Sequence, residues 1–145
     1  MVSCTEFIPL YSELFKYIEE NADHDAVVRF WYSLADTYVA DTLGKLVAEK
    51  GLEGCWEYWC KVSTEEACDI HREFDEENQV MTSTMRHCPS KGMLLKLDYM
   101  EPYHDYCGHC SVLYAPVLDK YGIERIETCD PDSASCSSIL RMKKK

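Results

Sequence analysis

The spacing of apolar residues changes along this chain, from a helical period up to residue 62 to an alternating, strand-like pattern from Ala67 onward. Helices followed by strands predict an α+β fold, in which N-terminal helices pack on one face of an antiparallel sheet of about four strands. A chain of 145 residues is long enough for one hydrophobic core. We therefore expect a single domain over residues 1–145, helical over 1–62 and arranged as hairpin, helix and hairpin over 67–145.

Two apolar stripes predict the first helices. One stripe consists of Phe7, Leu10, Leu14, Tyr17 and Ile18. The other begins after Asn21 or Asp23, either of which can cap the helix, and stops at Gly51. Its residues are Val27, Phe30, Trp31, Leu34, Tyr38, Leu43, Leu46 and Val47. The segment LEGCWEYWCKV predicts a third helix, whose aromatic face suits either a packed core or one wall of a ligand pocket.

Two hairpins and one helix are predicted in the second part of the chain. The runs ACDIHREF and QVMTSTMRHC are joined by the polar turn DEEN, as in an antiparallel hairpin. Pro89 and Gly92 in CPSKG break the strand, so a loop is expected there. Apolar spacing predicts a helix from Tyr103 to a stop at Gly122. The runs IERIET and SSILRM form the last hairpin around the turn CDPDSAS.

The charge balance restricts the partners of the protein. A formal net charge of −11 repels phosphate backbones and anionic lipid headgroups, so we expect neither nucleic acid nor a membrane as partner. No signal peptide or membrane-spanning run is visible, which predicts a soluble, cytoplasmic protein with reduced thiols. A small-molecule ligand is the expected partner, and a homodimer is an open alternative.

The segment YHDYCGHC concentrates histidine and cysteine. On the helix predicted there, His104, Cys107 and Cys110 are spaced three apart and share one face. His109 points elsewhere and can meet Asp105. This stripe offers an imidazole and two sulfurs at the start of a helix, where the helix dipole favours thiolate.

One interpretation of this stripe is a metal site. Cys88 ends the first hairpin, and Cys129 and Cys136 flank the last turn, so further sulfur ligands are available. The candidate ligands are Cys88, His104, Cys107, Cys110, Cys129 and Cys136. Such a set suits zinc, or iron, in tetrahedral coordination.

The competing interpretations use the thiols without a metal. Cys107 could act as a nucleophile with His104 as its base, and with Ser90, Lys91 or the backbone of PSKG as donor to an oxyanion. Cys107 and Cys110 could instead form a redox or sensor pair. The remaining cysteines fit as small core residues, namely Cys4, Cys55, Cys60 and Cys68.

The segments HCPSKG, YCGHC and DSASCSSILRMKK together resemble the L-2-amino-thiazoline-4-carboxylic acid hydrolases and, more distantly, ligand-binding domains of the 4-vinyl reductase type. The resemblance covers residues 67–145, and Cys88, Cys107 and Cys136 occupy its cysteine positions. This sequence differs from the family pattern in two ways. It has DSAS where a Gly-Asp pair is usual, and it has the additional residues His109 and Cys110. The resemblance implies an α+β domain around a small-molecule pocket, with hydrolytic opening of a cyclic C–N or C–S compound as the activity.

We therefore expect a small-molecule enzyme or binding protein, hydrolase-like by resemblance, with the Cys/His residues as its site. The alternatives are a non-catalytic zinc- or iron-binding protein that uses the same residues, and a thiol redox module.

Overall fold

The structure, a computed structural model, describes the backbone of residues 4–144 and the side chains of residues 5–144. The helices are α1 (Cys4–Asn21), α2 (His24–Leu34), the π-helical turn η1 (Ala35–Val39), α3 (Leu43–Lys50), α4 (Leu52–Glu65), α5 (Pro89–Leu94) and α6 (Gly108–Lys120). The strands are β1 (Asp69–Asp75), β2 (Val80–His87), β3 (Ile123–Cys129) and β4 (Cys136–Met142). The predicted α+β fold is confirmed. The side chain of Cys4 lies outside the described residues.

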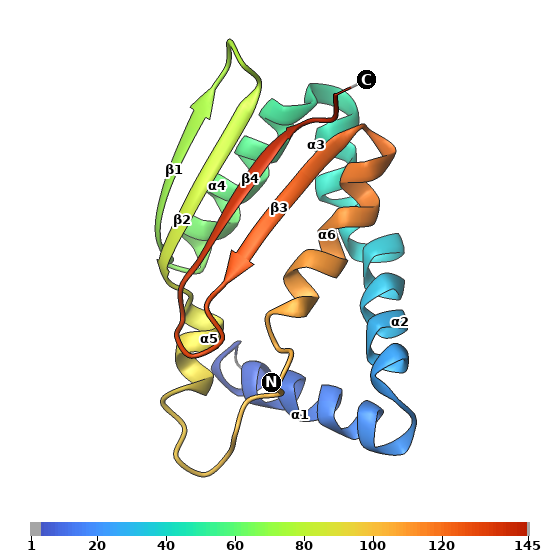
Figure 1. Cartoon of the computed structure of the whole chain (residues 1–145), viewed down its shortest axis with the longest axis vertical. Helices are drawn as coiled ribbons and strands as arrows, with labels where there is room; N and C mark the ends of the chain where they lie inside the picture. Colours follow the sequence, from blue (N-terminus) through green and yellow to red (C-terminus); the bar gives the residue numbers. More distant parts are fainter. Residues whose placement is uncertain (1–3, 145) are drawn as a thin grey trace.

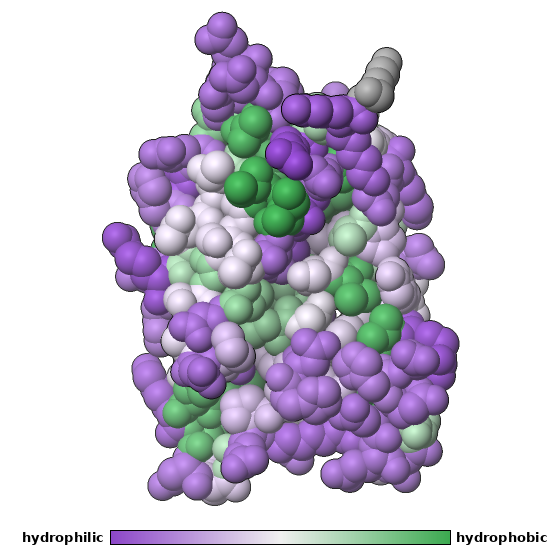
Figure 2. Space-filling model, viewed as in Figure 1, coloured by the Kyte–Doolittle hydropathy of each residue, from purple (hydrophilic) through white to green (hydrophobic). Residues whose placement is uncertain are grey.

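The strands form one antiparallel sheet in the order β1-β2-β4-β3. Helices α4 and α6 cover one face of it, while α1 and α5 lie at the end where the β3–β4 turn is found (Figure 1). Figure 2 shows the opposite face as mainly polar with a small apolar patch. On that face Ile126 and Ile139, paired across β3 and β4, are 43% and 40% exposed. The sheet therefore has one packed and one solvated face, as antiparallel sheets commonly do.

The long second helix is interrupted, which the apolar pattern did not predict. Asp23 caps α2 as expected, its carboxylate accepting a hydrogen bond from the Ala26 amide at 2.7 Å. A π-helical turn then replaces an α-helical one and shifts the buried face. As a result Ala35 and Val39 are buried, whereas Tyr38, predicted to be in the core, is 66% exposed.

The predicted apolar stripe of α1 is largely on its exposed side. Phe7 and Leu10 are 56% and 57% exposed, whereas Ser12 and Phe15 are completely buried. Both faces of this helix carry apolar residues, so the period alone could not select the packed one. Phe15 contacts the rings of Trp31 on α2 and Tyr103 in the segment before α6. That face therefore fixes α1 against α2 and the loop leading to α6.

Two clusters of buried side chains form the core. The larger lies between the sheet and helices α3, α4 and α6, and the smaller lies between α1, α2 and residues 94–112. Cys55 belongs to the larger cluster, in agreement with its prediction as a core residue. Within residues 4–144, no helix is both long enough and apolar enough to cross a membrane.

Two local predictions around the cysteines are wrong. CPSKG is not a loop but the start of α5, because Pro89 suits the first helical position and Cys88 serves as the N-cap. The helix expected from Tyr103 begins at Gly108, since residues 104–107 form a turn instead. Both changes affect which side chains can meet.

Candidate functional site

A cavity of about 170 Å³ lies between the sheet and helices α4 and α6. Side chains on alternate strand positions point to one face, so the strand residues that line this inner cavity are spaced two apart. Its walls include Arg72 of β1, Ser83 of β2, Cys136 and Ser138 of β4, Arg125 and Glu127 of β3, Trp59 of α4, and Cys110 and Tyr114 of α6. Polar and charged groups at core positions of a sheet indicate a functional site rather than packing alone.

A second, more open hollow of about 570 Å³ adjoins the inner cavity. The two share Cys68, Met85, Cys88 and Tyr114 as wall residues. The outer hollow is bordered by the start of α1, by the start of α5, and by Tyr106 and His109. The outer hollow therefore lies next to the inner cavity, with these shared side chains between them.

Arg125 holds a buried guanidinium at the inner cavity. It forms an ion pair with Glu127, and both side chains are less than 10% exposed, at 9% and 7%. Its Nη1 donates to the Cys110 carbonyl at 2.7 Å, and its Cζ lies 5.6 Å and 5.2 Å from the ring centroids of Trp59 and Tyr114. Its Nε is buried without a hydrogen-bond partner among the described residues. That donor is available to a ligand.

Arg72 adds a second guanidinium. Its Nε donates to Ser83 Oγ at 3.1 Å, and its Nη1 donates to the Trp59 carbonyl at 3.0 Å. Burial, together with the charge of Arg125, lowers the pKa of Arg72. Of the charged residues that line the inner cavity, two are cationic and Glu127 alone is anionic. The local charge is therefore positive, although the chain as a whole carries −11, and the cavity favours a small anion.

Cys110 and His109 form a contact at the boundary between the inner cavity and the outer hollow. The Sγ atom of Cys110 lies 3.4 Å from Nε2 of His109, and Nδ1 of His109 contacts the carbonyl oxygen of Tyr106. A carbonyl can only accept a hydrogen bond, so Nδ1 carries the proton and Nε2 is free to accept from the thiol. Burial lowers the pKa of His109, which keeps the imidazole neutral at pH values near 7.

The Cys110 thiol is protonated at rest. Burial, followed by the charge of Glu127, raises its pKa to about 11, and the positive charge of Arg125 opposes this rise. A neutral histidine beside a protonated thiol is the arrangement in which the histidine can remove the thiol proton as a substrate reacts.

The other predicted cysteines gather around the same region. Burial is the main cause that raises the pKa of Cys107 to about 11, and the nearby thiols of Cys110, Cys88 and Cys136 contribute to this rise. Cys129 and Cys136 face each other across β3 and β4, and burial raises the pKa of each to about 12. These cysteines are free thiols.

One part of this thiol cluster has the spacing of a metal site. Ligand atoms of Glu127, Cys129 and Cys136 all lie within 4.8 Å of one another. The Cys107 thiol is within hydrogen-bonding reach of Cys129. Three sulfurs and a carboxylate are suitable ligands for zinc. Glu127 is already engaged by Arg125 and by Ser111 Oγ, the latter at 2.7 Å, so coordination would require it to release one of them.

His104 does not join the cysteines, which corrects the predicted stripe of His104, Cys107 and Cys110. Because α6 begins only at Gly108, His104 lies in the preceding turn, and its Nε2 is 2.9 Å from a carboxylate oxygen of Glu19 on α1. The expected pairing of His104 as base with Cys107 is therefore absent from the described structure. The histidine beside a cysteine is His109, which had been expected to point elsewhere.

Lys91 lies on α5 rather than in a loop. It is only 7% exposed, and its positive charge lowers the pKa of Cys107 against the larger effect of burial. Lys91 and Cys107 are therefore neighbours, as the sequence interpretation required. The amide of Lys91 also donates to Cys88 Sγ at 3.5 Å.

Arg72, Arg125 and Glu127 were not among the site residues predicted from the sequence. A usable signal was present at the two-residue spacing of a buried strand face, because Arg125 lies two residues after Ile123, and Arg72 lies two residues from both Ile70 and Phe74.

Comparison with family models, with curated proteins and with solved structures finds no match to this chain.

Proposed function

We propose that the protein is a thiol-dependent enzyme that binds a small carboxylate-bearing compound in the inner cavity and attacks it with Cys110. The observation that carries this proposal is the Cys110–His109 contact beside a cavity with an excess of guanidinium groups. Arg72 and Arg125 orient the carboxylate, for which the planar guanidinium is well suited. We also propose a reducing compartment such as the cytoplasm for this enzyme, because the mechanism needs free thiols.

The chemistry follows from the hydrogen-bond pattern. Cys110 Sγ forms a bond to an electrophilic carbon of the substrate while its proton passes to His109 Nε2. The imidazolium then gives that proton to the heteroatom that leaves the carbon. Water, deprotonated by His109, attacks the same carbon, the S–C bond breaks, and the thiolate regains the proton. The net reaction is hydrolysis of a C–N or C–S bond, which agrees with the activity implied by the resemblance.

A pair of alkylating reagents tests both parts of the proposal. Iodoacetate carries a carboxylate, whereas iodoacetamide is its neutral counterpart. With either reagent an S–C bond forms, iodide leaves, and the thiol proton passes to His109. We expect Cys110 to prefer iodoacetate, relative to N-acetylcysteine in solution, when the products are measured residue by residue by mass spectrometry. A protein with a net charge of −11 should otherwise repel the anionic reagent.

Replacement of each arginine by methionine supplies the matched test. Arg72→Met and Arg125→Met should abolish the preference for iodoacetate, while Arg86→Met, an exposed arginine on the same sheet that pairs with Asp69, should leave it unchanged. Circular dichroism confirms that each variant is folded. The proposal is contradicted if Cys110 of the wild-type protein prefers iodoacetate over iodoacetamide no more than free N-acetylcysteine does.

The second candidate function is a non-catalytic zinc- or iron-binding protein. The observation that favours it is the group of Glu127, Cys129 and Cys136, with Cys107 beside it. Metal would then fasten the last hairpin to the start of α6. Protein purified without affinity metals should contain about one equivalent of zinc or iron. The metal should be lost in Cys129→Ser and retained in Cys60→Ser.

A further inference from the structure

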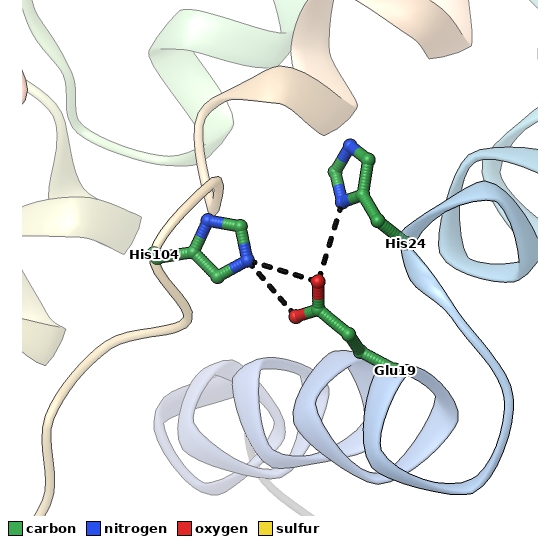
Figure 3. A group of neighbouring side chains, drawn as sticks. All are labelled: Glu19, His24 and His104. Carbon is green, nitrogen blue, oxygen red and sulfur yellow. Dashed lines mark hydrogen bonds and ion pairs between the residues drawn. The ribbon is translucent and has the colours of Figure 1, made fainter.

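A cluster of histidine and carboxylate side chains lies apart from the cysteines, at the junction of α1, α2 and the segment before α6. Glu19 is in the last turns of α1, His24 is the first residue of α2, and His104 is in the turn that precedes α6. Figure 3 shows the two imidazole rings directed toward the Glu19 carboxylate, that of His104 from the left and that of His24 from above. Segments distant in sequence thus present metal-binding atoms to one point.

The distances suit a small tetrahedral cation. Nε2 of His104 lies 2.9 Å from Oε2 and 3.2 Å from Oε1 of Glu19. Nδ1 of His24 lies 3.7 Å from the same Oε1 atom. All ligand atoms are within 4.8 Å of one another. Ligands bound to zinc at about 2.0–2.1 Å are separated by about 3.3 Å at a tetrahedral site. The distances from Glu19 to the two histidines are close to this separation, and the two imidazoles, whose ligand atoms lie within 4.8 Å, would move closer together around a bound ion.

The environment of His24 supplies a second, independent observation. Its other ring nitrogen, Nε2, lies 3.7 Å from Oδ2 of Asp105. A histidine that binds a metal through one nitrogen commonly donates from the other to a carboxylate, which fixes its tautomer and orientation. The Tyr103 hydroxyl is 2.9 Å from Nδ1 of His24 and also hydrogen-bonds to Glu19, so a bound ion would displace this hydroxyl from the two ligands.

The Asp105 carboxylate lies close to the backbone of residue 108. A Cβ at residue 108 would come within 2.5 Å of the Asp105 carboxylate, so glycine at this position makes room for it. The carboxylate beside His24 thus comes from the same turn that carries His104.

We propose that Glu19, His24 and His104 form a binding site for a divalent transition-metal ion, zinc in the first instance, with Asp105 as a positioning residue. The fourth ligand is water, because the cluster is partly exposed: the side chains of His24 and His104 are 42% and 65% exposed. The bound ion ties α1 and α2 to the segment that leads into Cys107, His109 and Cys110. This proposal does not depend on the enzymatic function.

Zinc titration by calorimetry tests the site, in a Cys107→Ser/Cys129→Ser background that removes two of the ligands of the other candidate metal group. We expect one equivalent of zinc to bind and to raise the Tm. Glu19→Gln and His104→Ala should abolish this binding, and Asp105→Asn should weaken it by about tenfold or more. His71→Ala is the matched control, because His71 contacts Glu73 at 3.2 Å on the exposed edge of the sheet, and within residues 5–144 no third metal-binding side chain joins this pair.

Cobalt absorption of the wild-type protein keeps the proposal testable if the serine background folds poorly. A site of nitrogen and oxygen ligands gives only weak visible bands, whereas thiolate ligation adds intense charge-transfer bands in the near ultraviolet. The weak bands should disappear in Glu19→Gln and persist in His71→Ala. Absence of zinc binding, or binding that Glu19→Gln and His104→Ala leave unchanged, would overturn the proposal.

Discussion

The Sγ atom of Cys110 lies 3.4 Å from Nε2 of His109, the residue that immediately precedes it in the chain. Neighbouring residues on a helix normally point in different directions. Here the contact forms because the Tyr106 carbonyl holds the far side of the imidazole and turns its Nε2 toward the thiol. The arrangement places a neutral base next to a thiol at the mouth of a positively charged cavity, and it leads to specific expectations about reactivity.

Removal of the imidazole should make Cys110 less reactive. His109→Gln preserves a polar side chain but has no group that can accept the thiol proton with the basicity of imidazole. We expect the rate of Cys110 alkylation by iodoacetamide at neutral pH to fall by about 100-fold, the lower range for general-base assistance. His71→Gln, on an exposed strand, should have no effect. Equal rates in wild type and His109→Gln would show that the contact does not activate the thiol.

The Glu127 carboxylate should restrain the same thiol. Burial and the charge of Glu127 raise the pKa of Cys110 to about 11. Below that pH, the thiolate fraction therefore increases about tenfold for each unit by which the pH rises. In His109→Gln, where the base is absent, alkylation should follow this slope. Adding Glu127→Gln removes the negative charge, lowers the pKa of Cys110 and should increase its alkylation rate at any fixed pH below about 11. A decrease would contradict this assignment of charge effects.

The class of fold could be predicted from the sequence because local period determines element type. The alternating pattern around DEEN gave β1 and β2, and helical spacing with Gly51 as a stop gave the end of α3, where the glycine adopts a φ of 59°. The choice of buried face was less secure. On α1 both faces are apolar, and after Leu34 a π-helical turn alters the register without a distinctive sequence signal.

The candidate site depended on contacts that a helical period cannot describe. His104 and Cys107 have the correct spacing for one helical face, yet Pro102 is followed by a turn and the helix starts only at Gly108. The convergence of Cys88, Cys107 and Cys136 was anticipated as a possibility and requires long-range packing of α5, α6 and β4. Long-range packing also brings the arginines to the cavity.

The packed face of α1 can be tested by substitutions on its two sides. Phe15 is completely buried among aromatic rings, so Phe15→Ala should lower the free energy of unfolding by about 3–5 kcal/mol. Leu10 is 57% exposed, and Leu10→Ala should lower it by about 0.5 kcal/mol or less. Urea denaturation of both variants provides the comparison. A larger loss for Leu10→Ala would indicate that the sequence-predicted stripe is the packed one after all.

The close approach of α3 and α4 requires glycine at residue 54. A Cβ there would lie 2.3 Å from the Leu46 carbonyl oxygen and 2.6 Å from its carbon, both of them backbone atoms that cannot rotate away. Gly54→Ala must therefore separate the helices, and since α4 carries Trp59, it must also displace one wall of the inner cavity. We expect a loss of about 2 kcal/mol or more in the free energy of unfolding, although alanine favours an isolated helix by about 1 kcal/mol over glycine. Glu53→Ala, at the exposed neighbouring position, is the control for helix propensity. Stabilisation by Gly54→Ala in urea denaturation would show that the helices do not approach as closely as described.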